Sequence, residues 1–360
     1  MRTALSVRSL VYIILAGVGC LMFSGQANSH PDPLENIKIY SYILSISEDN
    51  AYVYLNRGIC YRLVSDFTKA LDDFNQAEKL GIKGRPLWMN RAMAYLSLRK
   101  FDQAHREMSQ IIQDNPRDST SRFYRGEISF RKGNFKEAIE DYTAGLEVQK
   151  SPYLLFVRAD AYRTIGDSTH ALKDYSEAIA LANHMVPFRI ARARVYGSCK
   201  RYTEARQDLD EAIRLQPERY QVYIEKAVLS ASQGLEASRT ADLASALKYV
   251  EDEIFFRPND PAVLADRARV FELKGDLGHA VEDLNRAVDS AGPNDPRLLR
   301  LRAEFFHRHE RIKEATADLT QASVAENRPV PTATPLPGPT LTLEELSLQP
   351  TPNLLPELAR

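Results

Sequence analysis

The sequence predicts an all-α protein made of about eight copies of one helix-turn-helix unit. The first indication is a residue skeleton that recurs: Tyr54-Leu-Asn-Arg-Gly-Ile-Cys-Tyr61 returns as Trp88-Met-Asn-Arg-Ala-Met-Ala-Tyr95. The second is the period, because one small residue per copy recurs after 34, 34, 33, 34, 34, 41 and 35 residues, at Gly58, Ala92, Gly126, Ala159, Ala193, Ala227, Ala268 and Ala303. One such hairpin cannot bury its apolar face alone, so neighbouring copies must stack.

Each copy has the pattern of two amphipathic helices joined by a short turn. In the first copy, Tyr54, Gly58 and Tyr61 lie at helical spacing. A second small residue follows the first after 12 residues, or after 19 in the sixth copy. Turn residues such as Gly133 separate the helices, and prolines such as Pro116 end second helices because proline cannot continue one. The small residues allow the paired helices to approach closely.

This pattern resembles the tetratricopeptide repeat (TPR) family over residues 51–327. The resemblance implies a right-handed α-solenoid. The sixth copy carries seven extra residues within 233–243, which either lengthen its helices or form a protruding loop. The copies are expected near residues 51–84, 85–118, 119–151, 152–185, 186–219, 220–260, 261–294 and 296–327.

Residues 1–27 have the layout of an export signal or membrane anchor. Arg2 and Arg8 precede an apolar run over 10–23, and small and polar residues follow it. Three alternatives stay open: a cleaved signal ending at Gly25-Gln-Ala27, an uncleaved membrane tether through residues 9–25, and lipid attachment at Cys20. Each predicts an exported protein that is periplasmic, secreted or anchored outside the cytoplasm.

Two further segments flank the repeats. Residues 32–50 predict an N-terminal capping helix over the exposed face of the first copy, which a solenoid requires. The alternative is a mobile helix that binds a partner. Residues 328–360 are rich in proline and threonine, which predicts an extended, disordered tail. That tail is alternatively a ligand for another domain or a cover for the last copy.

The composition and motifs exclude several classes of function. The formal net charge of −1 gives no basic excess for nucleic acid. No phosphate-binding, nucleophile-elbow or zinc-protease motif occurs, so we predict no enzyme, no cofactor and no metal site. His307 and His309 would point about 200° apart on a helix and are expected to be solvated rather than to share a metal. Cys60 and Cys199 lie four copies apart, too far for an internal disulfide.

A charged pair recurs in seven copies. An arginine precedes the small residue of the first helix, and an acid follows it by 16 residues. In the sixth copy both change together, to Lys226 and Tyr249. We predict partly buried structural ion pairs, because the planar arginine fork suits a carboxylate better than lysine does. The alternative is an arginine ladder for an anionic partner, which the acids would neutralise. The pairs are Arg57 with Asp73, Arg91 with Glu107, Arg125 with Asp141, Arg158 with Asp174, Arg192 with Asp208, Arg267 with Asp283, and Arg302 with Asp318.

The resemblance also implies a concave groove lined by first-helix residues. In copies one to four these positions are apolar: Leu55, Ile59, Met89, Met93, Phe123, Tyr124, Phe130, Tyr153 and Phe156. In copies five to eight they are charged: Arg194, Asp266, Arg269, Glu272, Arg300, Glu304 and Arg308. Asn56 and Asn90 match a groove asparagine of relatives that grip a C-terminal carboxylate. Pro86 and Thr120 stand where lysines are expected, so no such clamp is predicted.

These observations predict a non-catalytic protein–protein interaction scaffold. Exposed apolar patches of this extent mark a partner, and methionine and aromatic side chains adapt to varied ligands. The expected partner is a peptide or helix of another protein in the groove, unless the N-terminal helix or the tail fills it. The alternative is an accessory subunit of an envelope enzyme or secretion complex that acts through the convex face or the proline-rich tail.

Overall fold

Helices α3 (Ala51–Leu63) and α4 (Phe67–Lys79) show how the repeated pattern becomes structure. The side chains of Asn50 and Asp66 accept hydrogen bonds from the first-turn amides of Val53 and Lys69, which caps the two helices. Ser65 between them has φ 63°, the left-handed conformation that reverses the chain. A computed structural model describes residues 32–292 and 295–325.

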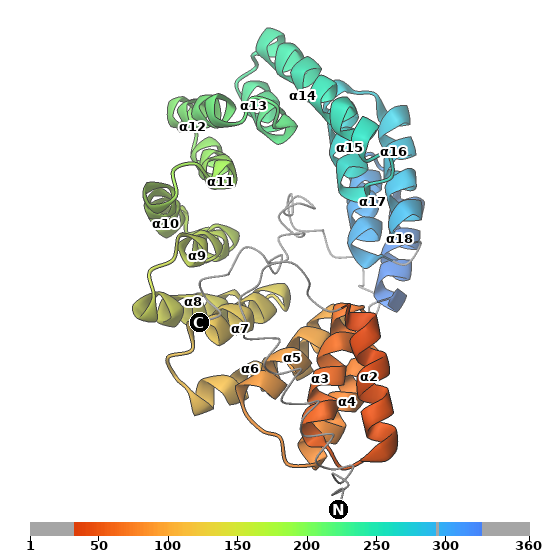
Figure 1. The fold of residues 1–360 in the computed structure, drawn as a ribbon. Helices are drawn as coiled ribbons and strands as arrows, with labels where there is room; N and C mark the ends of the chain where they lie inside the picture. The colour runs from red at the N-terminus through yellow and green to blue at the C-terminus, as the bar shows by residue number, and fades with distance from the viewer. Residues whose placement is uncertain (1–31, 293–294, 326–360) are drawn as a thin grey trace, which may run out of the picture. The chain divides into compact units, whose positions relative to one another are not determined.

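The described part of the chain is all-α, and its seventeen helices are packed in sequential pairs (Figure 1). Besides α3 and α4 they are α2 (Pro33–Ile46), α5 (Arg85–Ser97), α6 (Phe101–Asp114), α7 (Ser119–Arg131), α8 (Phe135–Val148), α9 (Pro152–Thr164), α10 (Ser168–Leu181), α11 (Val186–Ser198), α12 (Tyr202–Leu215), α13 (Tyr220–Ser232), α14 (Glu236–Phe256), α15 (Pro261–Lys274), α16 (Leu277–Ala291), α17 (Pro296–Arg308) and α18 (Ile312–Ala325). Each of the eight expected repeat ranges contains two of these helices.

The contacts divide the chain into two units, Met1–Val148 and Gln149–Arg360. Within unit 1, α3 packs on α4, α5 on α6 and α7 on α8, and α4 and α6 also pack on the first helix of the next pair. Within unit 2, the pairs from α9–α10 to α17–α18 stack in the same way. Each unit is therefore a stack of helical hairpins, as the period predicts.

The small residues bring the two helices of a hairpin into close contact. A Cβ atom added to Gly126 would lie 2.5 Å from a ring carbon of Tyr142, and one added to Gly58 would lie 2.7 Å from a ring carbon of Phe74. Both aromatic rings are fully buried. Glycine at these two positions thus makes room for a large side chain on the facing helix.

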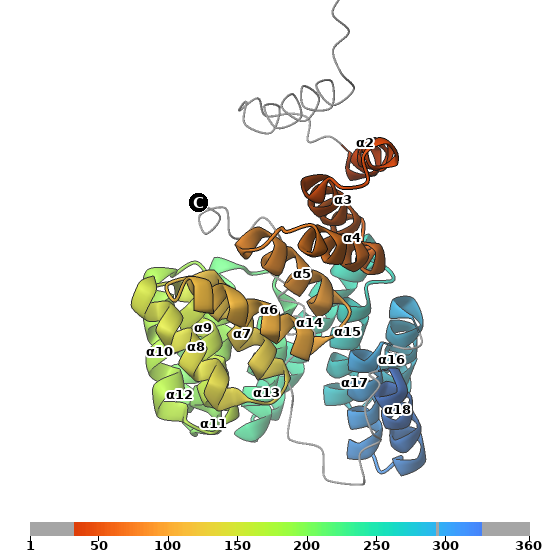
Figure 2. The same cartoon turned by 90° about the horizontal axis from the view of Figure 1, so that it is seen from below.

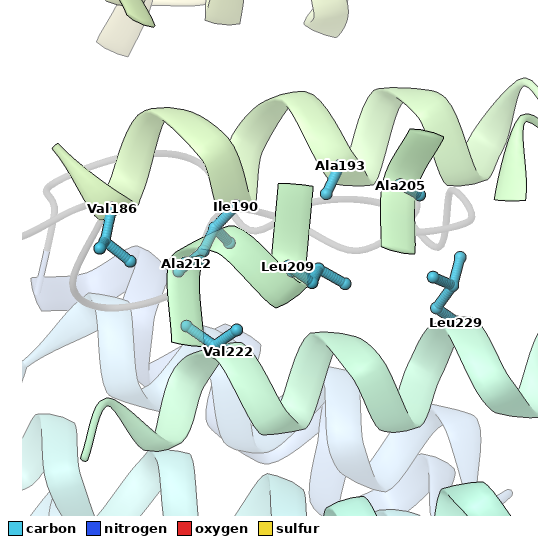
Figure 3. Packing of buried hydrophobic residues seen from close by; sticks show 8 residues of the cluster. All are labelled: Val186, Ile190, Ala193, Ala205, Leu209, Ala212, Val222 and Leu229. Atoms are coloured by element: carbon cyan, nitrogen blue, oxygen red, sulfur yellow. The ribbon is translucent and has the colours of Figure 1, made fainter. Parts of the chain in front are cut away.

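The core of unit 2 is continuous from one hairpin to the next. Figure 3 shows one cluster, in which side chains of α11 and α12 meet those of α13. Its buried members are Val186, Ile190, Ala193, Ala205, Leu209, Ala212, Val222 and Leu229. Because α13 belongs to the next repeat, the cluster joins two repeats as well as the helices within one.

Helix α2 lies where the second helix of a preceding repeat would lie. It packs on α3 (Figure 2), and its Tyr40 and Ile43 are buried against Val53 and Cys60. The geometry repeats that of later second helices. Ser41 of α2 accepts a hydrogen bond from Arg57, which lies 16 residues further along, and Ser109 accepts one from Arg125 at the same spacing.

The extra residues of the sixth copy lengthen a helix. Helix α14 has 21 residues, against 13 to 15 in the other helices of the described ranges (Figure 1). The sequence left open a longer helix or a protruding loop, and the structure contains the longer helix. Its second small residue, Ala246, is fully buried as in the other copies.

Some expectations fall on residues that the structure does not describe. The export signal or anchor at 1–27, with Cys20, and the proline-rich tail at 328–360 lie outside the described residues. Among residues 32–292 and 295–325, no helix combines the length and apolarity needed to cross a bilayer. The segment predicted as a capping helix, 32–50, contains α2.

Candidate functional site

The structure brings each predicted arginine and acid together between the two helices of its repeat. Arg57 on α3 donates from Nε and Nη2 to the two carboxylate oxygens of Asp73 on α4, both at 2.8 Å. The same two-bond arrangement, with distances of 2.6 to 2.9 Å, joins Arg125 to Asp141, Arg158 to Asp174, Arg192 to Asp208, Arg267 to Asp283, and Arg302 to Asp318.

These pairs lie inside the hairpins and are largely shielded from solvent. Among the six aspartates, no side chain is more than 7% exposed, and the six arginines are 17 to 22% exposed. Some of these arginines also donate a third hydrogen bond to the preceding repeat. Nη1 of Arg192, for example, donates to the hydroxyl of Ser176 at 3.0 Å. The arginines therefore point into the stack, which disfavours a ladder that presents free cations to an anionic partner.

Copies two and six vary the arrangement. Arg91 on α5 contacts Glu107 at 2.9 Å and also Glu78 of the preceding second helix at 2.6 Å. Burial raises the pKa of Glu107 in spite of the arginine beside it. In the sixth copy, where Tyr249 replaces the acid, Lys226 instead contacts the exposed Asp210 of the preceding second helix at 2.8 Å.

Three of the nine predicted groove residues are buried, which corrects the sequence-based expectation. Leu55, Phe123 and Phe156 are 7, 5 and 3% exposed. All three precede the small residue of their helix by one turn, so they face the large side chain that this small residue admits. The ring of Phe156 is stacked on Phe188 of the next first helix at 4.7 Å, and its centroid lies 5.7 Å from that of Tyr175.

The other six predicted groove residues are half-buried. Ile59, Met89, Met93 and Tyr124 lie on the first helices of unit 1, where they border the buried clusters. Phe130 packs edge-on against Phe135 at 5.2 Å, and Tyr153 in unit 2 packs against Phe156 at 6.4 Å. The apolar surface of the first helices is therefore narrower than predicted. In unit 1 it consists of the half-buried side chains of α3, α5 and α7.

Sequence reasoning missed one charged residue on this face of unit 1. Arg62 on α3 is half-buried, and its Nε donates to Oδ1 of Asn90 on α5 at 3.1 Å. Burial lowers its pKa, and nearby Tyr124 on α7 opposes that shift only in part. Within the described residues no carboxylate lies within ion-pair distance of Arg62. The sequence could have indicated Arg62, because it lies three residues after Ile59 and therefore on the same face of the helix.

The charged first-helix positions of unit 2 largely pair with one another. Glu225 on α13 is 7% exposed and lies 3.0 Å from Arg194 on α11 and 3.5 Å from Arg269 on α15. Burial alone would raise the pKa of Glu225, but the two guanidinium groups outweigh burial and lower it. This bridge joins the first helices of three successive repeats.

A second bridge joins α15 to α17. Glu272 accepts two hydrogen bonds of 3.0 Å from Arg308, and it also contacts Nε2 of His309 at 2.9 Å. His309 is therefore in contact with a carboxylate rather than freely solvated. In the described ranges no group of three or more metal-ligating side chains occurs.

The remaining charged positions of this face also have partners. Asp266 on α15 accepts a 3.0 Å bond from the hydroxyl of Tyr220, and both side chains are buried. Arg300 and Glu304 on α17 both have partners as well. The charged face of unit 2 is thus organised chiefly by contacts between repeats.

The comparisons with known proteins agree with this repeat architecture. Two family models, both described as tetratricopeptide repeat, match residues 89–154 and 186–219. The chain is a tetratricopeptide repeat protein. Proteins with TPRs are generally protein–protein interaction scaffolds and are usually non-catalytic, and neither matching model describes an enzyme.

Several curated TPR relatives match parts of the chain. RNA polymerase II-associated protein 3 of Rattus norvegicus is 28% identical over 131 residues, which cover 36% of this chain and 20% of that protein. Tetratricopeptide repeat protein 16 of Mus musculus is 25% identical over 256 residues, which cover 66% of this chain and 33% of that protein. The TPR chain thus spans a third or less of the length of these two relatives.

Yeast Tom70 and MamA are two of the solved structures that align with this chain. Tom70 aligns with a TM-score of 0.48 and 17% identity, over 82% of this chain and 75% of the Tom70 chain. MamA aligns with a TM-score of 0.43 and 18% identity, over 47% of this chain and 93% of its own.

Proposed function

We propose that this TPR protein is a non-catalytic scaffold that binds a peptide or helix of a partner protein on the first helices of unit 1. The binding face is formed by Ile59 and Arg62 of α3, Met89 and Met93 of α5, and Tyr124 of α7. Half-buried methionine and aromatic side chains adapt to the shape of a ligand. Because packed helices hold the face in place, little ordering is needed on binding.

Arg62 is the observation that carries this proposal. The seven arginines of the repeated pairs each face an acid, whereas Arg62 is half-buried and bonded to the neutral side chain of Asn90. A desolvated cation gains most from an anionic hydrogen-bond partner. We therefore expect the partner to place a carboxylate on Arg62 and apolar side chains on Met89 and Met93.

The experiment is affinity purification of the full chain, comparing Arg62→Gln and the double variant Met89→Ser with Met93→Ser against the wild type. Both changes are expected to weaken capture of the same partner about tenfold or more, because one removes the charge-assisted bond and the other the apolar contact. Leu181→Ser, at an exposed apolar position of α10, is the control. Thermal melting checks that each variant is folded.

Substituting Phe123, one of the three buried residues of the predicted groove, would disturb the core and test nothing about binding. If a partner binds the folded Arg62→Gln and double-methionine variants as tightly as the wild type, unit 1 is not the binding face. The accessory-subunit alternative, with its contact elsewhere on the chain, would then replace this proposal.

We also propose that the protein acts outside the cytoplasm. The support is the sequence of residues 1–27, in which Arg2 and Arg8 precede a long apolar run. Cell fractionation of the full chain and of a chain lacking residues 1–27 tests this. Export of the full chain alone is expected, and equal retention of both in the cytoplasm would contradict it.

A further inference from the structure

The end of α14 carries two aromatic side chains that almost no part of the fold covers. Phe255 is 81% exposed and Phe256 is 77% exposed, the highest values among the large hydrophobic residues in the part of the chain that is described. Their rings meet edge to face, with centroids 5.4 Å apart. Because covering exposed aromatic rings lowers the free energy, an adjacent pair of them marks a contact surface.

The repeat architecture does not require these side chains. Phe255 follows the second small residue of its copy by nine positions, and no other copy has an aromatic residue there. The corresponding residues are Lys79, Gln113, Glu147, Ala180, Arg214, Asp289 and Val324. Phe255 is thus a departure specific to the sixth copy, the same copy that lacks the arginine–acid pair and has the lengthened α14.

The two rings border an open hollow of about 400 Å³ with an acidic lining. Besides the two phenylalanines, the hollow is lined by Glu218, Tyr249, Asp252 and Glu253. Glu253 is held by Arg257, which also contacts Asp260 at 3.0 Å. Glu218 and Asp252 are exposed, and among the described residues neither has a hydrogen-bond or ion-pair partner. Two carboxylates are therefore free beside two exposed rings.

We propose that this hollow, formed by α14 and the turn before α13, docks a basic segment of a partner protein. A lysine or arginine of that segment lies over a phenylalanine ring, and its charge meets Glu218 and Asp252. A cation is attracted to the face of an aromatic ring, and the carboxylates select the positive sign. Apolar side chains beside the cation cover the remaining ring surface.

Contacts between a guanidinium group and an aromatic ring occur elsewhere in the chain. Arg311 lies 4.4 Å from the ring centre of Phe306, and Arg201 lies 4.5 Å from that of Tyr196. No arginine or lysine of the described ranges lies over Phe255 or Phe256. The two rings and the two acids of the hollow are therefore available to a cation from another molecule. This surface belongs to unit 2 and does not depend on the binding face proposed on unit 1.

The test measures binding of a fluorescent eight-residue peptide of alternating arginine and leucine to the full chain by anisotropy. A peptide of alternating glutamate and leucine is the probe of opposite charge. The double variant Phe255→Ser with Phe256→Ser is expected to weaken binding of the basic peptide about tenfold, since two ring contacts are lost. Glu218→Gln with Asp252→Asn is expected to weaken it severalfold and to reduce its salt dependence.

Two matched controls make the result specific. Val324→Ser changes the exposed residue at the corresponding position of α18, and Glu140→Gln changes an exposed acid of α8; both are expected to leave binding unchanged. Serine at positions this exposed should not disturb folding, which circular dichroism checks. Equal binding of the two peptides, or unchanged binding by the phenylalanine variant, would overturn the proposal. Concentration-dependent self-association that this variant abolishes would instead identify a second copy of the chain as the occupant.

Discussion

In seven copies the residue before the small residue of the first helix is arginine. Two nitrogens of its guanidinium group bind both oxygens of one carboxylate, and a third nitrogen remains for the preceding helix. Arg125 illustrates all three bonds, two to Asp141 and one to Ser109. Lysine has no guanidinium group. In the sixth copy Lys226 accordingly makes a single contact with an exposed acid. The change of both partners in that copy is what two bonded positions are expected to show.

Removing one of these acids should destabilise the fold. Asp73→Asn leaves Arg57 largely shielded without its counter-charge, and we expect a loss of about 2–3 kcal/mol in the free energy of unfolding. The neighbouring Asp72 is exposed and provides a matched control, because Asp72→Asn should change stability by less than about 0.5 kcal/mol. Urea denaturation measures both variants. Equal stability of the two would mean that the pair contributes nothing.

The bridge at Glu225 predicts a pH dependence. Its pKa is lowered in the folded state, so its contribution to stability is fully present above the unfolded value of about 4.3. That contribution is lost as the pH falls through the lower folded value, because protonation removes the charge that binds Arg194 and Arg269. Glu225→Gln should therefore cost about 1–3 kcal/mol at pH 7 and progressively less in acid. Urea titrations from pH 7 downward test this, and a pH-independent difference would contradict it.

The residues that sequence reasoning located correctly are those that follow the period. Arginine and acid recur at one spacing in seven copies, so each copy supports the others. The ring of Phe188, which stacks on Phe156, is instead particular to its copy, because Val53, Leu87, Ser121 and Leu154 stand at the equivalent positions of copies one to four. Arg62 has no arginine at the equivalent position of the next copy, where Leu96 stands, so repetition did not single it out. Periodicity thus predicts the scaffold well and an individual surface poorly.

At the scale of elements, α2 behaves as half of a repeat. It supplies the second-helix contacts to α3, including the bond from Arg57 to Ser41, and it covers Val53 and Cys60. Its sequence lacks the small residue and the acid of a second helix, with Asn36 and Ile39 in their places. That absence is why it is recognised as a cap from amphipathicity and not from the repeat pattern.

The cover that α2 provides can be measured through a thiol. Cys60 is buried under α2, and burial raises the pKa of its thiol, so it should react slowly with a thiol reagent. In a chain carrying Cys20→Ser and Cys199→Ser, the substitution Ile43→Asp should loosen α2 and speed labelling of Cys60 by tenfold or more. Tyr42→Asp, on the exposed side of the same helix, is the control. Labelling that is equally fast in all three chains would show that α2 does not protect α3.

Helix α14 shows that the repeat register tolerates an insertion. The seven extra residues fall before Ala246, and Ala246 and Ala227 still belong to the same buried cluster. Residues Glu236 to Asp242 include alanine, arginine and glutamate, which favour a helix and contain no glycine or proline. A longer helix and a protruding loop would both keep Ala246 in the core, so the pattern of core residues alone did not decide between them.

At the scale of the whole molecule, each unit gains its stability from contacts between neighbouring repeats. In such a stack the free energy of unfolding is close to a sum of repeat and interface contributions, so a local change should act locally. In unit 2, α17 packs on α18 and on α16, while α9 to α12 lie several repeats away along the stack. A defect at the last repeat should therefore spread over a short distance only.

Asp318→Asn tests this directly. The substitution leaves Arg302 without the carboxylate that accepts its bonds of 2.7 and 2.8 Å, so α17 and α18 should open more often. Hydrogen exchange followed by mass spectrometry should show exchange about tenfold faster or more in these two helices, a smaller change in α15 and α16, and none in α9 to α12. Glu310→Gln, an exposed acid in the turn between α17 and α18, should change nothing. Uniform acceleration across α9 to α18 would mean instead that unit 2 opens as one cooperative body, because a nearest-neighbour stack cannot transmit the loss of one pair over its full length without attenuation.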